Sequence, residues 1–400
     1  MIKTGKTKEI IPLPFPVYLW TTAVLAFAGL CDSAYLAVNH FRNYTDLGYS
    51  SFCAISRAIN CDTVAQSPYS ILAGLPVAVW GMIGYIFLLL FIFFAGTKKA
   101  ENKRIWPSLF LFSFVFSMFS LFYAFISIYS IHSFCIMCII SYGLNFFLLF
   151  YTWLVKKRFE NKGLIAGLKK DLGFIFKNKD KFFFIFSPFI ICVIIIYIFF
   201  PAYWNVKPPP VSDMAEHGIT IDGHPWTGAK KTGAKSTGTQ YPLLIINEFT
   251  DYQCFQCKKM HFFLRRLLVK YPGRIRLIHR NFPMDSKVNP LIKQNFHTGS
   301  GAMALFSIYA ASKGKFWEIN DALFNIDRRK KSVNIKKLAE KEGLDISNIN
   351  VLYNKNIRKI LLNDIREGLS LGITGTPSYV IDGRVYLGNI PPEILKKVIN

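Results

Sequence analysis

The sequence predicts a multi-domain protein in which an all-α bundle of five membrane-spanning helices precedes a smaller α/β domain. Three observations predict it: five apolar runs of membrane-spanning length, a Cys-x-x-Cys that opens the fourth run, and a strand–turn–helix pattern that carries a second Cys-x-x-Cys. The chain has 400 residues, enough for two or three domains. Because 52% of the residues are hydrophobic, an ordinary soluble protein is a poor explanation.

Five apolar runs are long enough to cross a bilayer, which takes about 20 apolar residues in a helix. They are roughly 17–38, 75–95, 108–130, 134–155 and 182–201. Asp32 in the first run and Asn145 in the fourth are tolerable near a helix end or on a side that faces protein. The first run has no clear small-residue cleavage site, so we expect a retained span rather than a removed signal peptide.

Much of the net charge of +24 falls in segments that flank these runs, which favours membrane orientation over nucleic-acid binding as its cause. The tail at 1–16 and the connections at 96–107 and 156–181 are rich in lysine and arginine, whereas those at 39–74 and 130–134 are poor in them. By the positive-inside rule, we expect a cytoplasmic N-terminus and, after five spans, an extracytoplasmic C-terminal domain.

Six of the eight cysteines fall into three pairs on the predicted outer side: Cys53 with Cys61, Cys135 with Cys138, and Cys254 with Cys257. That compartment is oxidising, and a helix N-terminus favours a thiolate, so the pairs suit redox chemistry. Loops on one face can bring two pairs within the roughly 7 Å that a disulfide requires, so electrons could pass between them by thiolate attack. Cys31 and Cys192 lie inside spans and are expected to pack as small apolar groups.

Over roughly residues 15–155 the sequence resembles the vitamin K epoxide reductase family, specifically its bacterial members. The matching stretches are Phe52-Cys53, Asn60-Cys61-Asp62, Ser67, Gly74-Leu75-Pro76, and Ser133-Phe134-Cys135-Ile136-Met137-Cys138 with Tyr142. A loop pair followed by a Cys-x-x-Cys that opens the fourth span makes the resemblance specific. It implies a four-helix membrane domain over 17–155 and a membrane quinone, ubiquinone or menaquinone, as electron acceptor.

The resemblance also implies roles for the four cysteines of this domain. Cys135 and Cys138 would form the quinone-facing active site, with Cys138 nearer the quinone. Cys53 and Cys61 would be a shuttle pair, in which Cys61 receives electrons from the partner domain and Cys53 passes them to Cys135. A static disulfide that only fastens the loop is the alternative for the shuttle pair.

Tyr142 is the candidate for contacting the quinone, because it matches a position that lines the quinone pocket in the family. A phenol one turn below Cys138 could hydrogen-bond a quinone carbonyl. An ordinary interfacial aromatic side chain is the alternative. We match no polar pocket residue on the second span, where the stretch Val77-Ala-Val-Trp80 offers only Trp80, and we expect Trp80 to pack, so the other contacts to the quinone headgroup are left open.

Beyond the four-helix domain, we expect a basic cytoplasmic loop at 156–181, the fifth span at 182–201 and a linker at 202–240. The linker combines a stiff proline run at 208–210 with a later, flexible part rich in glycine, threonine and lysine. Such a tether would keep the C-terminal domain near the membrane and raise the effective concentration of its thiols there.

An α/β domain is expected over 241–400. Its first predicted elements are a strand at 243–249, a turn at 250–253, a helix at 258–270 and a second strand at 274–279. With Cys254 and Cys257 at the helix start, this arrangement resembles redox-active thioredoxins. The resemblance implies an exposed first cysteine with a stabilised thiolate, and a second cysteine that resolves mixed disulfides.

The segment 375–383 resembles the cis-proline segment that faces the Cys-x-x-Cys in thioredoxin-fold proteins. Pro377 would be that proline, and Thr376 would offer backbone groups to an extended substrate. The part at about 285–371 is predicted to be largely helical, so the domain resembles DsbA-like thioredoxins with a helical insertion. The dipeptide Phe255-Gln256 departs from those common in that group, which leaves the strength of the oxidant open.

No metal is expected at Cys254 and Cys257, because a structural zinc site usually takes four ligands and no second Cys-x-x-Cys or paired histidines accompany them. His261 follows Cys257 by one turn and is expected at the surface or in packing. His279, in the second strand, is expected to be satisfied within the fold.

The combined hypothesis is a membrane thiol oxidase that makes disulfides in exported proteins and delivers the electrons to quinone. Electrons would pass from reduced exported proteins to Cys254–Cys257, then to Cys61–Cys53, then to Cys135–Cys138. The expected location is the bacterial inner membrane, with the thiol domain in the periplasm. Exported proteins, lipid and quinone are the expected partners, and nucleic acid is not.

Two alternatives remain open from the sequence. An outward-directed reductase or isomerase would use the same parts in reverse, but no cysteine pair lies on the predicted inner side to receive cytoplasmic electrons. A thiol-based metal carrier would need no catalysis, but no Met-rich or His-rich tract supports it. The resting redox state of Cys254–Cys257 distinguishes the first alternative, and metal content after gentle purification distinguishes the second.

Overall fold

The computed structural model describes residues 15–46, 49–55, 58–96, 105–159, 163–205, 207–211, 216–228, 243–293, 296–326, 334–344, 346 and 349–399. Almost all of the predicted N-terminal tail, and the predicted linker after residue 228, lie outside these ranges. The chain divides into two compact units, one comprising Met1–Asn43 and Tyr49–Ala202 and the other Tyr44–Gly48 and Tyr203–Asn400.

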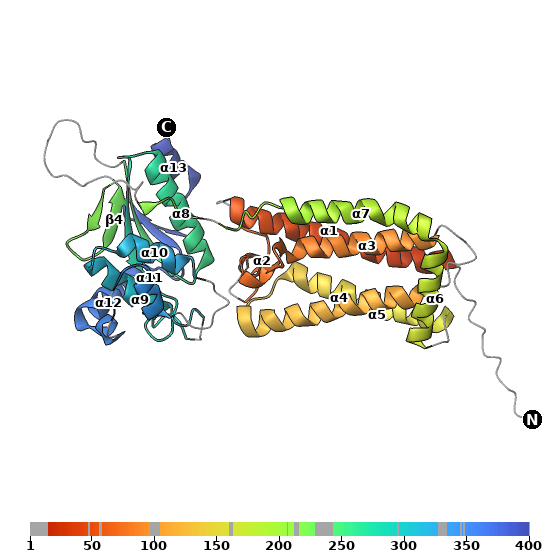
Figure 1. Cartoon of the computed structure of the whole chain (residues 1–400). Coiled ribbons are helices and arrows are strands. Elements are labelled where there is room, and N and C mark those ends of the chain that lie inside the picture. Colours follow the sequence, from red (N-terminus) through yellow and green to blue (C-terminus); the bar gives the residue numbers. More distant parts are fainter. Residues whose placement is uncertain are drawn as a thin grey trace, which may run out of the picture. The chain divides into compact units, whose positions relative to one another are not determined.

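Five helices of the first unit are long and apolar enough to cross a membrane, which confirms the predicted membrane bundle. They run side by side (Figure 1). Their bounds are α1 Phe15–Thr45, α3 Val77–Gly96, α4 Trp106–Ile126, α5 Ile136–Phe159 and α7 Lys179–Phe199. A π-helical turn at Ser127–Ile131 prolongs α4.

Between α1 and α3 lies a compact loop with short elements of its own. These are α2 Cys61–Ala65, a 3₁₀ turn Pro68–Ser70, and a hairpin of β1 Ile71–Leu72 and β2 Leu75–Pro76. The predicted loop at 39–74 therefore begins later than expected, because α1 continues to Thr45. Polar residues at this end of α1 bond to the loop, and this stabilises the added turns.

The segment expected as a basic loop at 156–181 is mostly helical, so that expectation is corrected. α5 continues to Phe159, and α6 Leu164–Lys177 follows. The buried residues of α6 are Gly167, Asp171 and Phe174, whose spacing of four and three places them on one face of the helix. Lys169, Lys170 and Lys177 lie on the exposed surface of α6 beside exposed apolar side chains, and the charge of the segment alone predicts a loop.

Residues of α6 and α7 belong to the same core as the first four spans. Asp171 accepts hydrogen bonds from the backbone N–H and the hydroxyl of Ser108, at 2.9 and 2.6 Å, and so satisfies donors in the first turn of α4. Phe94 of α3 packs against Phe174 of α6 and Phe186 of α7, with ring centroids 5.4 and 6.4 Å away. The fifth span is thus part of the bundle.

The second unit is built on a six-stranded sheet in the order β3-β4-β6-β5-β7-β8. The strands are β3 His217–Ile219, β4 Pro225–Gly228, β5 Leu244–Thr250, β6 Ile275–Asn281, β7 Ser378–Ile381 and β8 Arg384–Leu387. The central strands β5 and β6 are parallel and are joined by α8 Phe255–Lys270, while the other pairs are antiparallel. The α/β prediction for this part of the chain is confirmed.

Two of these strands, β3 and β4, lie inside the segment 202–240 that was expected to be a linker, which is a correction. Trp226 of β4 is paired with Ile278 of β6, and the guanidinium of Arg276 lies 4.1 Å from the centre of its ring. Composition rich in glycine, threonine and proline favours a linker, and it gives no sign of a partner strand 50 residues away.

The chain between β6 and β7 is largely helical, as predicted for the insertion. Its helices are α9 Ser300–Ser312, α10 Phe316–Phe324, α11 Ile335–Lys341 and α12 Lys355–Ser370, with a 3₁₀ turn at Ile349–Tyr353. A last helix, α13 Pro392–Ile399, follows β8. These helices and α8 lie around the sheet (Figure 1).

Candidate active site

The loop between α1 and α3 brings one cysteine pair next to another. Cys53 and Cys61 form a disulfide with their Cα atoms 5.6 Å apart, and both side chains are buried. The backbone N–H of Asn60 donates to Phe134 O at 2.8 Å, and that of Phe134 donates to Ala58 O at 2.7 Å. Cys61 and Cys135 directly follow these paired residues, and both pack with Cys53 in one buried cluster.

Polar side chains fasten this loop to the end of α1. Asp62 accepts from the backbone N–H of Ser51 at 3.0 Å and from the side-chain amide of Asn43 at 3.1 Å. Asn43 in turn accepts from the side chain of Gln66 at 2.9 Å. The side chain of Asn60 caps α2 by accepting from the backbone N–H of Thr63 at 2.9 Å. Cys61 is therefore held at the first turn of a short, anchored helix.

The pair Cys135 and Cys138 opens α5 with both thiols free. The backbone N–H of Cys138 points at Cys135 Sγ, 3.2 Å away. Hydrogen bonding from Cys138 is the main cause of a lowered pKa at Cys135, although burial opposes it. The first cysteine of this pair is thus the one whose thiolate the helix start stabilises.

A cavity of about 490 Å³ lies in the same unit, and Cys61, Cys135 and Cys138 all line it. Most of the lining is apolar or aromatic, and Tyr142 is part of it, as expected for a pocket residue. Trp80 also lines the cavity, and its indole N–H donates to Leu72 O at 2.9 Å, so it packs on the hairpin rather than offering a free donor.

A quinone headgroup fits the donors that this cavity presents. Ser67 lines the cavity, and its buried hydroxyl has no hydrogen-bond partner among the described residues. Together with Tyr142 it could bond a carbonyl oxygen, while the apolar walls suit a ring and an isoprenoid chain. Ser67 belongs to the matched stretches, but its lack of a partner becomes visible only in the structure.

In the second unit, Cys254 caps the start of α8, and the backbone N–H of Cys257 points at its Sγ, 3.2 Å away. The Thr376–Pro377 peptide bond is cis, and Thr376 O lies 3.5 Å from Cys254 Sγ. The structure thus brings together the four residues expected at this site, which are Cys254, Cys257, Thr376 and Pro377. Cys254 is only 8% exposed, so the expectation of an exposed first cysteine is wrong for the side chain as a whole.

His297 is a functional candidate that the sequence analysis missed. Burial raises the pKa of Cys254, but hydrogen bonds from Cys257 and the charge of His297 outweigh burial and lower it to about 7. The ring of His297 lies 3.0 Å from Asp251, whose carboxylate also accepts from the backbone N–H of Met284 at 2.6 Å. No local motif marks His297, because it follows Cys254 by 43 residues.

Replacing His297 by asparagine is expected to raise the pKa of Cys254, because the positive charge that favours the thiolate is removed. Alkylation of the reduced protein by iodoacetamide, followed by mass spectrometry against pH, should rise through about pH 7 for the wild type. In the variant the rise should move to higher pH, and each unit lowers the thiolate fraction at pH 7 by up to about tenfold. His217→Asn, on exposed β3, is the control, and an unchanged profile in H297N would contradict this assignment.

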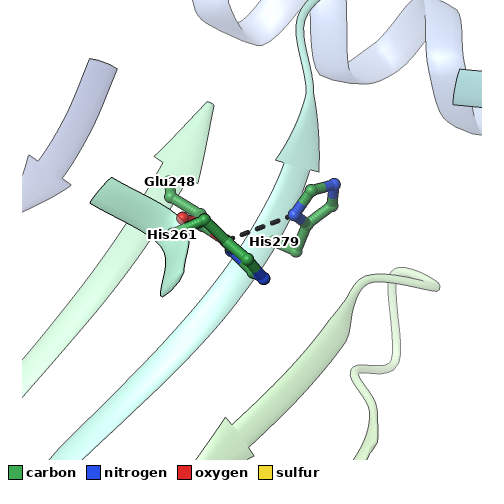
Figure 2. Close-up of side chains that lie close together, drawn as sticks. All are labelled: Glu248, His261 and His279. Carbon is green, nitrogen blue, oxygen red and sulfur yellow. Dashed lines mark hydrogen bonds and ion pairs between the residues drawn. The ribbon is translucent and has the colours of Figure 1, made fainter. Parts of the chain in front are cut away.

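In the same unit three buried side chains from β5, β6 and α8 meet: Glu248, His261 and His279 (Figure 2). The Nδ1 atoms of His261 and His279 lie 2.5 and 3.2 Å from Glu248 Oε1. His261 is therefore a packing residue, and the surface alternative is wrong. Cys257, His261, Leu264 and Leu268 follow each other at helical spacing and are all buried, a pattern that the sequence already carries.

This cluster is where the described residues could hold a metal ion, since the three ligand atoms lie within 4.8 Å of one another. Two imidazoles and a carboxylate are ligands that Zn²⁺ accepts. Here hydrogen bonds join the groups instead, and the Nε2 atoms of His261 and His279 lie 2.9 Å from Asn320 Nδ2 and 3.3 Å from the Tyr252 hydroxyl. The expectation of no metal stays an expectation.

A membrane bundle with a cysteine pair at an apolar cavity, and an α/β unit with a Cys-x-x-Cys facing a cis-proline, define the class: a membrane-bound thiol–disulfide oxidoreductase. Residues 20–153 match the model of the vitamin K epoxide reductase family, and residues 234–400 match a thioredoxin family model. The chain therefore combines a vitamin K epoxide reductase domain with a thioredoxin-like domain, as the two resemblances predict.

Among curated proteins, the chain is similar to the Na(+)/H(+) antiporters NhaA 3 of Salinispora tropica and NhaA 1 of Salinispora arenicola, with 23% and 22% identity over 159 residues. These alignments cover 40% of this chain and 23% of each antiporter, so the chain spans about a quarter of their length.

Solved structures similar to the chain include a thioredoxin-like oxidoreductase from Silicibacter pomeroyi, at 20% identity and a TM-score of 0.33. The match covers 44% of this chain and 90% of that chain. The thiol-disulfide exchange protein alpha-DsbA2 of Wolbachia pipientis has 21% identity and a TM-score of 0.33, over 44% of this chain and 84% of that chain.

Proposed function

We propose that the protein is a quinone-dependent thiol oxidase that introduces disulfides into exported proteins. The observation that carries the proposal is the cavity of the membrane unit, which Cys61, Cys135 and Cys138 line together with Tyr142. Two cysteine pairs at one apolar cavity in a membrane bundle are placed to exchange electrons with each other and with an apolar acceptor. Ubiquinone and menaquinone both have this character.

The proposed electron path uses each pair once. A client thiolate attacks Cys254 Sγ, and the second client thiolate then forms the client disulfide and leaves Cys254 and Cys257 reduced. Cys254 next attacks Cys61, Cys257 resolves the mixed disulfide, and Cys53 passes the electrons to Cys135. Oxidation of the Cys135–Cys138 dithiol supplies the two electrons and two protons that turn one quinone into quinol.

The positive-inside rule supports an inner-membrane location with the thioredoxin-like unit in the periplasm, because the basic connections alternate with basic-poor ones. All three cysteine pairs would then work in an oxidising compartment. The same placement disfavours the reductase alternative, which needs a cytoplasmic thiol donor. A resting state in cells that is mostly disulfide at Cys254–Cys257 would support the oxidase, and a mostly reduced pair would support the reductase.

The test of the proposal is quinone reduction by the purified protein in detergent, with a reduced, unfolded dithiol protein as substrate. We expect ubiquinone-1 or menadione absorbance to fall with one quinol formed per client disulfide. No quinone reduction with either acceptor would contradict the proposal. In a Cys257→Ser variant, Cys254 can attack the Cys53–Cys61 disulfide and release Cys53, but no second thiol resolves the product, so a Cys254–Cys61 mixed disulfide should accumulate, mapped by mass spectrometry, whereas adding Cys254→Ser should abolish it.

A further inference from the structure

Asp32 is a buried carboxyl group within α1 for which packing gives no reason. It is 6% exposed, and the hydroxyl of Ser141 on α5 donates a hydrogen bond to its Oδ2. The other oxygen, Oδ1, is buried and has no hydrogen-bond partner among the described residues. An ionisable side chain inside a membrane-spanning segment is costly, and it is a functional-site hypothesis by default.

Asp171 shows what a structural role looks like for a buried aspartate in the same unit. Its carboxylate accepts from a backbone N–H and a hydroxyl in the first turn of α4, so it satisfies a helix end. Asp32 lies in the interior of α1, far from both Phe15 and Thr45, and bonds to no backbone N–H of the described residues. Its one hydrogen bond joins it to a side chain of the cavity.

Ser141 connects Asp32 with that cavity. It follows Cys138 by three residues, which places both on one face of α5, and both line the cavity. Asp32 itself is not among the lining residues. The Ser141 hydroxyl is therefore the group that lies between the carboxyl group and the space beside Cys138.

The surroundings of Asp32 favour its protonated form. Tyr85, Cys135 and Cys138 lie within electrostatic reach of Asp32, and none of them is a cation. Tyr85 donates its phenol hydrogen to Asn145 at 2.6 Å. In the described part of the chain no lysine, arginine or histidine pairs with Asp32, and a buried carboxyl group without such a partner is much less costly when neutral.

We infer that Asp32 and Ser141 form a proton relay for the quinone step, an inference that rests on the proposed function. Ser141 contacts the quinone oxygen, and Asp32 is a positioning residue that stores a proton and acts through Ser141. As the Cys135–Cys138 disulfide forms, two S–H bonds break and two electrons leave for the quinone. Asp32 gives its proton through the Ser141 hydroxyl to one quinone oxygen, and a thiol proton restores the carboxyl group, so the two thiol protons end on the quinol.

The test separates the quinone step from the thiol steps in the full-length protein. Protein reduced at Cys135–Cys138 is mixed with ubiquinone-1, and quinol formation is followed in a single turnover in H₂O and in D₂O. Asp32→Asn should slow this step by roughly 100-fold, Ser141→Ala should slow it similarly, and Asp32→Glu should restore most of the rate. Transfer from Cys254–Cys257 to Cys53–Cys61, followed by a thiol-alkylation gel shift, should keep its wild-type rate in every variant.

A second readout needs no quinone. Infrared spectra of the reduced protein should contain the C=O stretching band of a protonated carboxyl group, which D32N removes. Asp171→Asn is the matched control, because it replaces the other buried aspartate that bonds a serine, and it should keep both this band and the wild-type solvent isotope effect.

Three outcomes would overturn the inference. If D32N forms quinol at the wild-type rate, the relay is wrong while the proposed function stands. If D32N also slows thiol transfer between the pairs, Asp32 supports the fold instead. If the wild-type protein forms no quinol, both the proposed function and the relay fall.

Discussion

Replacing Cys135 by serine is expected to abolish catalytic quinone reduction, to about one-thousandth of the wild-type rate or less. In the proposed path the electrons leave for the quinone as Cys135 and Cys138 join in a disulfide, and a serine hydroxyl cannot form one. The variant should still react once with its clients through the Cys254–Cys257 and Cys53–Cys61 disulfides. A stoichiometric burst of client oxidation without turnover, measured with a free-thiol assay and quinone absorbance together, is therefore the expected signature.

The two cysteines outside the pairs provide the controls for this result. Cys31 and Cys192 are free and exposed in the described chain, and they lie in α1 and α7. Cys31→Ser and Cys192→Ser should keep full turnover. Full turnover in Cys135→Ser as well would contradict the proposed electron path, because some other group would then be reducing the quinone.

The second large effect concerns the stability of the thioredoxin-like unit. Glu248→Gln is expected to lower its free energy of unfolding by about 3–5 kcal/mol, the usual cost of breaking a buried ionic cluster by removing one partner. Burial would raise the pKa of Glu248, but the charge of His261 and hydrogen bonds from His261 and His279 lower it to about 2. The folded state therefore holds this carboxyl group as a carboxylate.

The cluster of Glu248, His261 and His279 also determines whether the stability of the thioredoxin-like unit rises or falls with pH. Since the pKa of Glu248 is lowered from 4.5, its contribution is present above pH 4.5 and is lost as the pH falls toward about 2. Burial also lowers the pKa of His261 below 6.5, so the unfolded chain takes up the proton first. Stability should consequently fall on acidification, beginning near pH 6.5.

Hydrogen exchange of peptides from β5 and β6, read by mass spectrometry in urea at several pH values, measures this unit separately from the membrane bundle. Protection should fall as the pH is lowered from 7 toward about 2 in the wild type. In E248Q the part of the loss below pH 4.5 should disappear. Glu393→Gln, on the exposed surface of α13, should behave as the wild type does, and equal pH profiles in E248Q and wild type would contradict the argument.

Local patterns in the sequence carry much of the fold. Each span is a run of apolar residues, and each Cys-x-x-Cys opens a helix within one turn of itself, so neither needs information from distant residues. The cis-proline segment could be matched to Cys254 because Thr376 and Pro377 form a recognisable local motif. These are the features for which the sequence analysis and the structure agree.

The features that the sequence does not reveal depend on partners far along the chain. The sequence of β4 resembles that of a linker, and its pairing with β6 shows that it is a strand. The sequence explains Asp32 only as a polar residue that a membrane helix can accommodate, whereas the structure shows its hydrogen bond with Ser141, 109 residues later. His297 can be identified as a candidate site residue only from the structure, which places it next to Asp251. The periodicity of hydrophobic residues and the spacing of motifs indicate contacts between residues within one or two helical turns along the chain. The contacts of β4, Asp32 and His297 all join residues much farther apart in the sequence.

The hydrogen bonds by which Asp171 caps the start of α4 have a consequence for the folding of the membrane unit. Ser108 and Asp171 are separated by 63 residues, so this cap on α4 can form only once the chain extends through α6. The aromatic contacts of Phe94 with Phe174 and Phe186 are delayed in the same way. A chain cut at residue 155 would keep Cys53, Cys61, Cys135 and Cys138 yet lack Asp171, Phe174 and Phe186, so the stretch that carries these two cysteine pairs is shorter than the stretch that completes the core of the bundle.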